Sequence, residues 1–191
     1  MRNPIYLKLS KEDILRIQQQ DERFLLKLYN DSFPLMMSVA VRYKNNREEQ
    51  LTAVHNSFLK MLRSIHQFHL NSSFEAWILR ILRNELIDEF RRTNKQSNIK
   101  FTELNHDIAT EQFNFELLEN AEPTQLLHFL NELPPASKIV FNLYAIDEFS
   151  IKQISEALGI SIETVKWHLK TSRKTLRARI STLKPQANEN E

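Results

Sequence analysis

The segment SIKQISEALGISIETVKWHLKTSRKTLRAR, residues 150–179, decides the fold of this chain. It contains Gly159, the only glycine among 191 residues. Ser150 and Gln153 have the spacing of a capping box, which predicts that a helix begins at the residue after Ser150. Gly159 supplies the left-handed residue that ends a helix at low cost, and Ser161 can cap a second helix. Two short helices joined by such a tight turn predict a helix-turn-helix.

Apolar residues recur at helical spacing on one face of each predicted helix, and the opposite face of the second helix is polar and cationic. The residues expected to turn inward are Ile151, Ile154, Leu158, Val165, Leu169 and Leu176. Those expected to face outward are Glu163, Thr164, Lys166, Trp167, Lys170, Arg173 and Lys174. Such a face is typical of a helix in the major groove of DNA. The alternative is an αα-hairpin whose basic face only keeps the protein in solution.

The composition of the chain favours an all-α fold with one or two domains. One glycine and six prolines are too few for a turn-rich β protein, and 41% apolar residues are enough for real cores. An enzyme is not expected, because a single glycine leaves no loop to cradle phosphate. Six scattered histidines without clustered carboxylates do not form a metal-site pattern. We therefore expect no catalytic residues, no metal and no cofactor.

Three features of the sequence predict a cytoplasmic protein without membrane insertion. There is no cysteine, which suits a reducing compartment. The N-terminal residues MRNPIYLKLSKED lack the apolar region of a signal peptide. No apolar run is long enough to cross a bilayer.

The net charge of +2 hides a strongly uneven distribution. Residues 1–100 carry 17 basic and 11 acidic side chains, whereas residues 101–133 carry seven acids and no lysine or arginine. Residues 134–184 are basic again, with nine basic and four acidic side chains. The pattern predicts two basic helical domains separated by an acidic flexible linker.

Caps and apolar spacing predict the remaining helices. Pro34 is expected in the first turn of a helix, where its missing N–H costs nothing, so that a helix ending at Tyr29 precedes a separate one. Trp77 lies at helical spacing with apolar neighbours and is expected in the core rather than at a ligand. The predicted helices cover residues 11–18, 22–29, 34–43, 48–66, 74–95, a segment opening at 123, and 136–145, with loops at 67–73 and 97–122.

The helix predicted over residues 74–95 is apolar around most of its circumference but keeps one polar strip. Arg80, Asn84 and Arg91 lie within about 40° of one another at about 100° per residue, with Arg83 nearby. Such a strip on a buried helix favours a ligand surface. The alternative is a solvated face with the ion pairs Glu85–Arg92 and Asp88–Arg91.

Two stretches together resemble bacterial sigma factors. The segment LPPASKIVFNLYAIDEFSIKQISEALGISIETVKWHLKTSRKTLRARI is similar to their −35-binding domain. FLKMLRSIHQFHLNSSFEAWILRILRNELIDEFRR resembles their promoter-melting domain, and its pattern F-x-A-W-I-x-R-I-x-R-N-x-x-I-D-x-x-R-R is the more specific of the two. The order of the two stretches, and the lack of a third folded domain between them, resemble the extracytoplasmic-function (ECF) group of the sigma-70 family.

The resemblance implies three sets of functional residues. Those at the −10 element are Phe68, His69, Asn71, Ser72, Ser73, Arg80, Arg83, Asn84 and Arg91. Those at the −35 element are Ser161, Glu163, Thr164, Lys166, Trp167, Lys170, Arg173 and Lys174. Those that dock on the clamp coiled coil of RNA polymerase are Leu51, His55, Asn56, Phe58, Leu59 and Leu62.

The chain departs from the family pattern in two places. The docking helix of the family usually carries D-A-E-D-x-x-Q-E-x-F, whereas the matching run here is EQLTAVHNSF. Trp167 stands where a smaller residue is more usual.

The resemblance implies a sigma factor that binds core RNA polymerase, reads the −35 element as duplex and captures the melted −10 strand. The expected partners are core polymerase, promoter DNA and an anti-sigma factor, and the free chain is expected to be a monomer. The alternatives are a helix-turn-helix activator of the response-regulator or quorum type and a helical bundle that binds only proteins. The expected domains are 1–96 for melting and polymerase docking, 97–122 as linker and 123–184 for the −35 element, with a disordered tail at 185–191.

Overall fold

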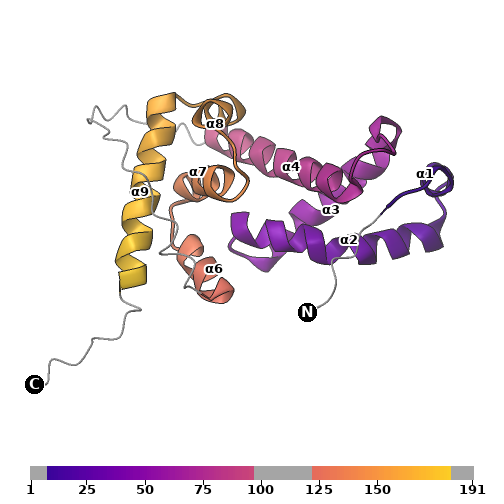
Figure 1. Ribbon diagram of the computed structural model, residues 1–191, viewed down its shortest axis with the longest axis horizontal. Coiled ribbons are helices and arrows are strands. Elements are labelled where there is room, and N and C mark those ends of the chain that lie inside the picture. Colours follow the sequence, from indigo (N-terminus) through magenta and orange to yellow (C-terminus); the bar gives the residue numbers. More distant parts are fainter. Residues whose placement is uncertain (1–7, 97–121, 182–191) are drawn as a thin grey trace, which may run out of the picture. The chain divides into compact units, whose positions relative to one another are not determined.

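The computed structural model describes residues 8–96 and 122–181, and every regular element within these ranges is helical. The chain divides into two compact units, Met1–Arg92 and Thr93–Glu191. The helices are α1 (Lys11–Gln18), α2 (Glu22–Tyr43), α3 (Arg47–Ser64), the 3-10 turn η1 (Ile65–Gln67), α4 (Phe74–Gln96), α6 (Pro123–Asn131), α7 (Pro135–Ala145), α8 (Ile151–Leu158) and α9 (Ile162–Ser181) (Figure 1). The expected all-α class is thereby confirmed. Residues 97–121 of the predicted linker and the whole predicted tail lie outside the described residues.

Side-chain caps explain where the first helices begin. The Asp13 amide donates to Ser10 Oγ at 3.1 Å, and the Ser10 amide donates to Asp13 Oδ2 at 2.8 Å, which closes a capping box. Asp21 and Asn46 cap α2 and α3 more simply, because each side-chain oxygen accepts from the backbone amide three residues later, that of Phe24 and that of Glu49. The bounds predicted for the first helix are confirmed.

The prediction of two helices around Pro34 is wrong, because α2 runs unbroken from Glu22 to Tyr43. A proline inside a helix removes one backbone hydrogen bond, here the one to the carbonyl of Asn30. Pro34 and Asn30 are both exposed, so water can reach that carbonyl. The opposite side of α2 buries Met36 and Ala40 completely, and this packing holds the helix together across the proline.

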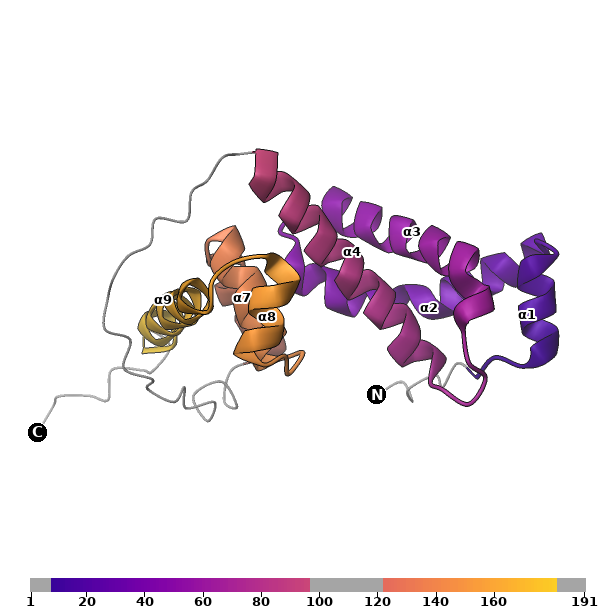
Figure 2. The same cartoon turned by 90° about the horizontal axis from the view of Figure 1, so that it is seen from above.

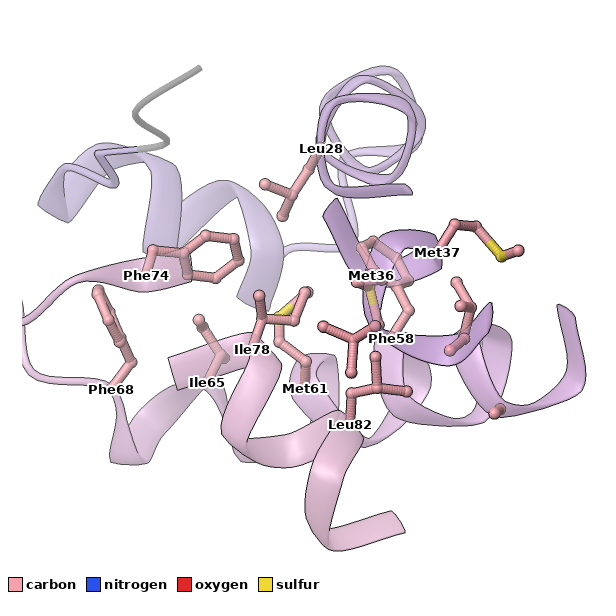
Figure 3. Packing of buried hydrophobic residues seen from close by; sticks show 14 of the residues in the cluster. Leu28, Met36, Met37, Phe58, Met61, Ile65, Phe68, Phe74, Ile78 and Leu82 are labelled. Atoms are coloured by element: carbon pink, nitrogen blue, oxygen red, sulfur yellow. The ribbon is translucent and has the colours of Figure 1, made fainter. Parts of the chain in front are cut away.

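One apolar core joins α2, α3 and α4 of the first unit. α2 and α3 lie side by side, and α4 packs its inner face against the pair (Figure 2). Figure 3 shows Ile78 and Leu82 of α4 beside Met61 of α3, and all three side chains are fully buried. The outer face of α4 thereby stays in solvent.

An aromatic cluster fastens the loop before α4 to this core. The ring of Phe68 packs edge-on against Phe74, with centroids 5.7 Å apart, and lies 5.2 Å from the indole of Trp77. Phe74 is 1% exposed and Trp77 is partly buried in the same cluster. The core role predicted for Trp77 is confirmed.

The predicted helix-turn-helix is confirmed in α8 and α9. The Gln153 amide donates to Ser150 Oγ at 3.2 Å, and the Ser150 amide donates to Gln153 Oε1 at 2.8 Å. Gly159 has φ 68° and ends α8 in the left-handed conformation. Ser161 caps α9, because its Oγ accepts from the Thr164 amide at 3.1 Å.

α9 is the longest helix of the second unit, and α6, α7 and α8 all pack against it (Figure 1). The C-terminal part of α9 joins a cluster of buried apolar side chains from α6, α7 and the turn between them. An ion pair between Arg179 Nε and Glu132 Oε2 at 2.5 Å adds to this contact. The cluster comprises Phe129, Leu130, Leu133, Phe141, Leu176 and Ile180. No described helix has the length and apolarity needed to span a membrane.

Candidate nucleic-acid interface

A polar strip runs along the outer face of α4. Arg80, Asn84 and Arg91 are exposed there, as their spacing predicts, while Ile78 and Leu82 on the inner side are buried. Arg83 lies beside the strip and is half-buried. The strip therefore presents two guanidinium groups and one amide on a helix whose position is set by its buried face.

Three acids of α4, Glu85, Asp88 and Glu89, pair with lysines outside the helix and leave the strip positively charged. Lys60 Nζ on α3 lies 3.3 Å from Glu85 Oε2, and Lys44 Nζ lies 2.7 Å from Glu89 Oε1. The predicted pair of Glu85 with Arg92 forms at 3.3 Å.

Asp88 faces Lys60 at 3.8 Å rather than the predicted Arg91. Within residues 8–96 and 122–181, neither Arg80 nor Arg91 has an ion-pair partner. The alternative interpretation, a solvated face whose charges are paired with one another, therefore does not fit Arg80 and Arg91.

The loop over residues 68–73 exposes some of its predicted ligand groups and uses others to hold its own shape. His69 and Asn71 are exposed. Ser72 Oγ donates to the His69 carbonyl at 2.6 Å, and Ser73 Oγ accepts from the Ala76 amide at 3.1 Å and so caps α4. Both serines are exposed, but their hydroxyl groups already form hydrogen bonds within the loop and at the start of α4.

Phe68, predicted to meet the −10 strand, is buried in this structure rather than exposed for stacking. Its side chain is only 7% exposed and belongs to the aromatic cluster of the first core. Burial removes the ring face that a base would need for stacking. Phe68 instead anchors the loop that carries His69 and Asn71.

The outer face of α9 collects the residues predicted for duplex contact. Lys170 and Lys174 are exposed, together with Glu163 near the helix start. Lys166 and Trp167 are partly buried along the same face. The opposite face is apolar and buried, as expected, at Val165, Leu169 and Leu176.

Three of the other predicted contact residues are partly engaged within the unit. Ser161 is exposed but caps α9, and its hydroxyl lies 2.9 Å from the hydroxyl of the half-buried Thr164. The guanidinium of Arg173 lies over the ring of Tyr144, 5.9 Å from its centroid. The lysines and Trp167 are therefore the groups of this face that are best placed to meet a ligand.

Sequence reasoning missed His168, which supports this face from below. It is 3% exposed, and its Nδ1 forms a hydrogen bond with Ser137 Oγ of α7 at 2.9 Å. Burial lowers the pKa of His168 to about 4, so the ring is neutral at physiological pH. His168 lies three residues after Val165 and four before Ser172, which is the spacing of the buried face of α9. This spacing could have predicted its burial from the sequence.

The outer face of α3 carries most of the residues predicted for docking. Leu59 is 49% exposed, beside the exposed His55 and Asn56, and Leu51 and Leu62 are half-buried. The exposed Leu59 shares this face with the half-buried Leu51 and Leu62, and the three leucines together form an apolar patch suited to a protein contact.

Phe58 departs from its predicted place on this surface. It is 6% exposed and packs edge-on against Tyr29 of α2, with ring centroids 5.1 Å apart. Phe58 therefore does not lie on the exposed docking surface, because its helix position turns it toward α2. Tyr29 in turn lies 5.8 Å from the ring of His55.

Within residues 8–96 and 122–181, no three histidine, cysteine or acidic side chains lie together as ligands of one metal ion.

Comparison with known proteins relates both units to one family. The family described as Sigma-70 region 2 matches residues 28–96, and the family described as Sigma-70, region 4 matches residues 124–176. The first match contains the strip of α4 and the face of α3, and the second contains the helix-turn-helix.

Similar proteins match across both units. The RNA polymerase sigma factor SigV of Bacillus subtilis is 24% identical over 167 residues, which cover 87% of this chain and 97% of SigV. The ECF RNA polymerase sigma factor SigE of Mycolicibacterium smegmatis is 24% identical over 149 residues, and the chain spans about half (54%) of that protein. The sigma factor RpoE of Bartonella quintana, solved in complex with the anti-sigma factor NepR, aligns with TM-score 0.48 at 18% identity, over 87% of this chain and 98% of that one.

Proposed function

We propose that this chain, which belongs to the ECF group of the sigma-70 family, directs promoter-specific transcription through two separate DNA-binding faces and one polymerase-binding face. The observation that carries the proposal is the strip of Arg80, Asn84 and Arg91 on a unit distinct from the helix-turn-helix. A simple operator-binding protein has no need of a second cationic face on another unit.

The first face would capture the melted −10 strand. Taking a base out of the stack costs a few kcal/mol, which stacking and cationic contacts can offset. His69 and Asn71 offer a ring and an amide on the loop, and Arg80 and Arg91 offer charge to the strand. Asn84 would read a base edge between the two arginines.

The second face would read the −35 element as duplex. α9 would enter the major groove with Lys166, Lys170 and Lys174 directed at phosphates. Glu163 and Trp167 would then lie against base edges. Ser161, Thr164 and Arg173 would set the start of the helix and flank these contacts.

The third face would bind the clamp coiled coil of core RNA polymerase. Its members are Leu51, His55, Asn56, Leu59 and Leu62 of α3. This patch is apolar and nearly uncharged, so affinity would come from burial of the leucines rather than from ion pairs. Phe58 would support the patch from beneath.

The proposed organisation assigns melting and docking to residues 1–96, the linker to 97–122, the −35 element to 123–184 and a tail to 185–191. An anti-sigma factor is a further expected partner of such a protein. Core polymerase, promoter DNA and this partner belong to the proposal, and so does a monomeric state of the free chain.

Run-off transcription with core polymerase tests the proposal. We expect Asn84→Ala to reduce open-complex formation by about 5–150-fold, the range of one lost bidentate base contact at about 1–3 kcal/mol. Lys170→Ala should weaken promoter binding and lower its salt dependence by about one phosphate contact. Arg16→Ala is the matched control, because Arg16 is exposed and pairs with Glu12 at 3.1 Å on α1, and it should leave initiation unchanged.

Two outcomes would contradict the proposal. The sigma-factor function fails if core polymerase neither associates with the chain nor gains start-site choice from it. Specific binding of the free chain to an operator, as a dimer and without polymerase, would instead establish the activator.

A further inference from the structure

Trp167 is the one large aromatic side chain on the outer face of α9. The helix contains no other tryptophan, tyrosine or phenylalanine. Trp167 is half-buried, and it lies between Lys166 and Lys170 along a face that continues to Lys174. A ring of this size among flexible cations is a rigid apolar surface at the centre of a charged one.

The indole is held in place from below. Its ring packs edge-on against the imidazole of His168, with centroids 4.8 Å apart and an interplanar angle of 75°. Nδ1 of His168 forms a hydrogen bond with Ser137 Oγ at 2.9 Å, and Ser172 Oγ donates to the Ser137 carbonyl at 3.1 Å. The imidazole cannot turn without breaking a buried hydrogen bond, so it fixes one side of the indole.

The support does not change with pH under physiological conditions. Burial keeps the pKa of His168 at about 4, and the ring stays neutral. A neutral, buried imidazole does not repel the lysines on the outer face of α9. It also has no charge that would draw the ring out toward water. Trp167 therefore needs little ordering when a ligand meets it, which favours a shape-specific contact.

The ligand chemistry follows from the base edges that a helix meets in the major groove. Guanine, adenine and cytosine present only hydrogen-bonding groups there, whereas thymine also presents its C5-methyl group. An indole offers an apolar face to that methyl group and gains nothing from the polar edges. The flanking lysines suit the phosphates on either side.

We propose that Trp167 is a specificity-determining residue that contacts the C5-methyl group of one thymine in the −35 element, with His168 as its positioning residue. The inference rests on the proposed function. A tryptophan in this place would also suit a protein partner. DNA is favoured because Lys166, Lys170 and Lys174 have no ion-pair partner within residues 8–96 and 122–181 and match a polyanion.

The test compares thymine with deoxyuridine, which differ only by the methyl group. Holoenzyme made from core polymerase and the full chain first selects promoters from a library randomised over the −35 region. Each thymine of the selected element is then replaced singly by deoxyuridine, and initiation is measured. With the wild-type chain we expect one position at which deoxyuridine lowers initiation about fourfold, the loss of one buried methyl group.

Variants assign that position to the indole. Trp167→Ala should lower initiation and make thymine and deoxyuridine equivalent there, while Trp167→Phe should keep part of the difference. Lys170→Ala is the matched control, because it weakens all promoters but should leave the thymine-to-deoxyuridine ratio intact. His168→Ala should reduce the ratio, and His168→Phe, which keeps a ring under the indole, should restore part of it.

Three results would overturn the inference. They are a selected −35 element without a constant thymine, a wild-type chain indifferent to every methyl group, and a methyl effect that persists in Trp167→Ala. Unchanged base preference with lost binding of a protein would assign Trp167 to that protein instead. Initiation that ignores a scrambled −35 region would refute the proposed function itself, so the two failures are distinguishable.

Discussion

Acidification should destabilise the second unit through one side chain, His168. The pKa of this imidazole falls from the ordinary 6.5 to about 4 because the ring is buried. The folded state therefore holds His168 neutral, while the unfolded chain takes up a proton at higher pH. The associated stability is complete above the unfolded pKa and is lost as the pH falls through the window from 6.5 toward 4.

The two pKa values set the size of the effect. The whole difference corresponds to at most ~3.4 kcal/mol, of which about 2 kcal/mol falls between pH 7 and pH 5. Relaxation of the surrounding helices around a protonated ring recovers part of that cost. We therefore expect the unfolding free energy of the second unit to fall by about 1–2 kcal/mol more in wild type than in His168→Asn.

Urea unfolding monitored by tryptophan fluorescence measures this difference. The chain has two tryptophans, one in each unit, so a Trp77→Phe background leaves Trp167 as the reporter of the second unit. Ser137→Ala is the control: it removes the hydrogen bond to His168 and should cost about 1–2 kcal/mol at both pH values while the acid sensitivity persists. Parallel wild-type and His168→Asn curves, or an NMR titration of His168 above pH 6, would refute the reasoning.

Three further substitutions test the fold. Pro34→Ala should stabilise the first unit by about 1–3 kcal/mol in urea unfolding, because it restores a helix hydrogen bond, and a loss of stability would contradict this. Gly159→Ala meets no atom within 4 Å but needs φ near +68°, so it should cost about 1 kcal/mol of thermal or urea stability, with Gly159→Asn closer to wild type. Phe68→Ala should cost about 3–5 kcal/mol of first-unit stability, read from Trp77 fluorescence, whereas unchanged stability with lost promoter opening would return Phe68 to the DNA surface.

The helix-turn-helix was predictable from sequence because its determinants are short-range. A capping box spans four residues, and a left-handed turn needs only a glycine at one position, here Gly159. The outer strip of α4 was predictable for the same reason, since Arg80 and Asn84 are one turn apart. Such rules hold wherever the local preference and the tertiary packing agree.

The sequence did not predict helix continuity or side-chain burial where contacts between distant residues decide them. Pro34 favours a helix start, but the burial of Met36 and Ala40 on the far side of α2 outweighs this preference. Phe68 lies in a loop, where no periodicity reveals the core. His168 was overlooked because its burial depends on Ser137, 31 residues earlier, whose hydroxyl satisfies the ring.

The charge arrangement also explains why neither of the two proposed DNA-binding faces should suffice alone. Lys166, Lys170 and Lys174 can neutralise about three phosphates, fewer than the 6–10 contacts at which salt-sensitive affinity becomes large. Under the proposed function, the exposed Arg80 and Arg91 would add two contacts on the other unit. DNA binding by either unit alone would therefore be weak. Binding by the whole chain would become strong only when a partner protein holds both units on one promoter. The apolar face of α3 is the surface that we propose for that partner, because burial of its leucines would give an affinity that salt does not weaken.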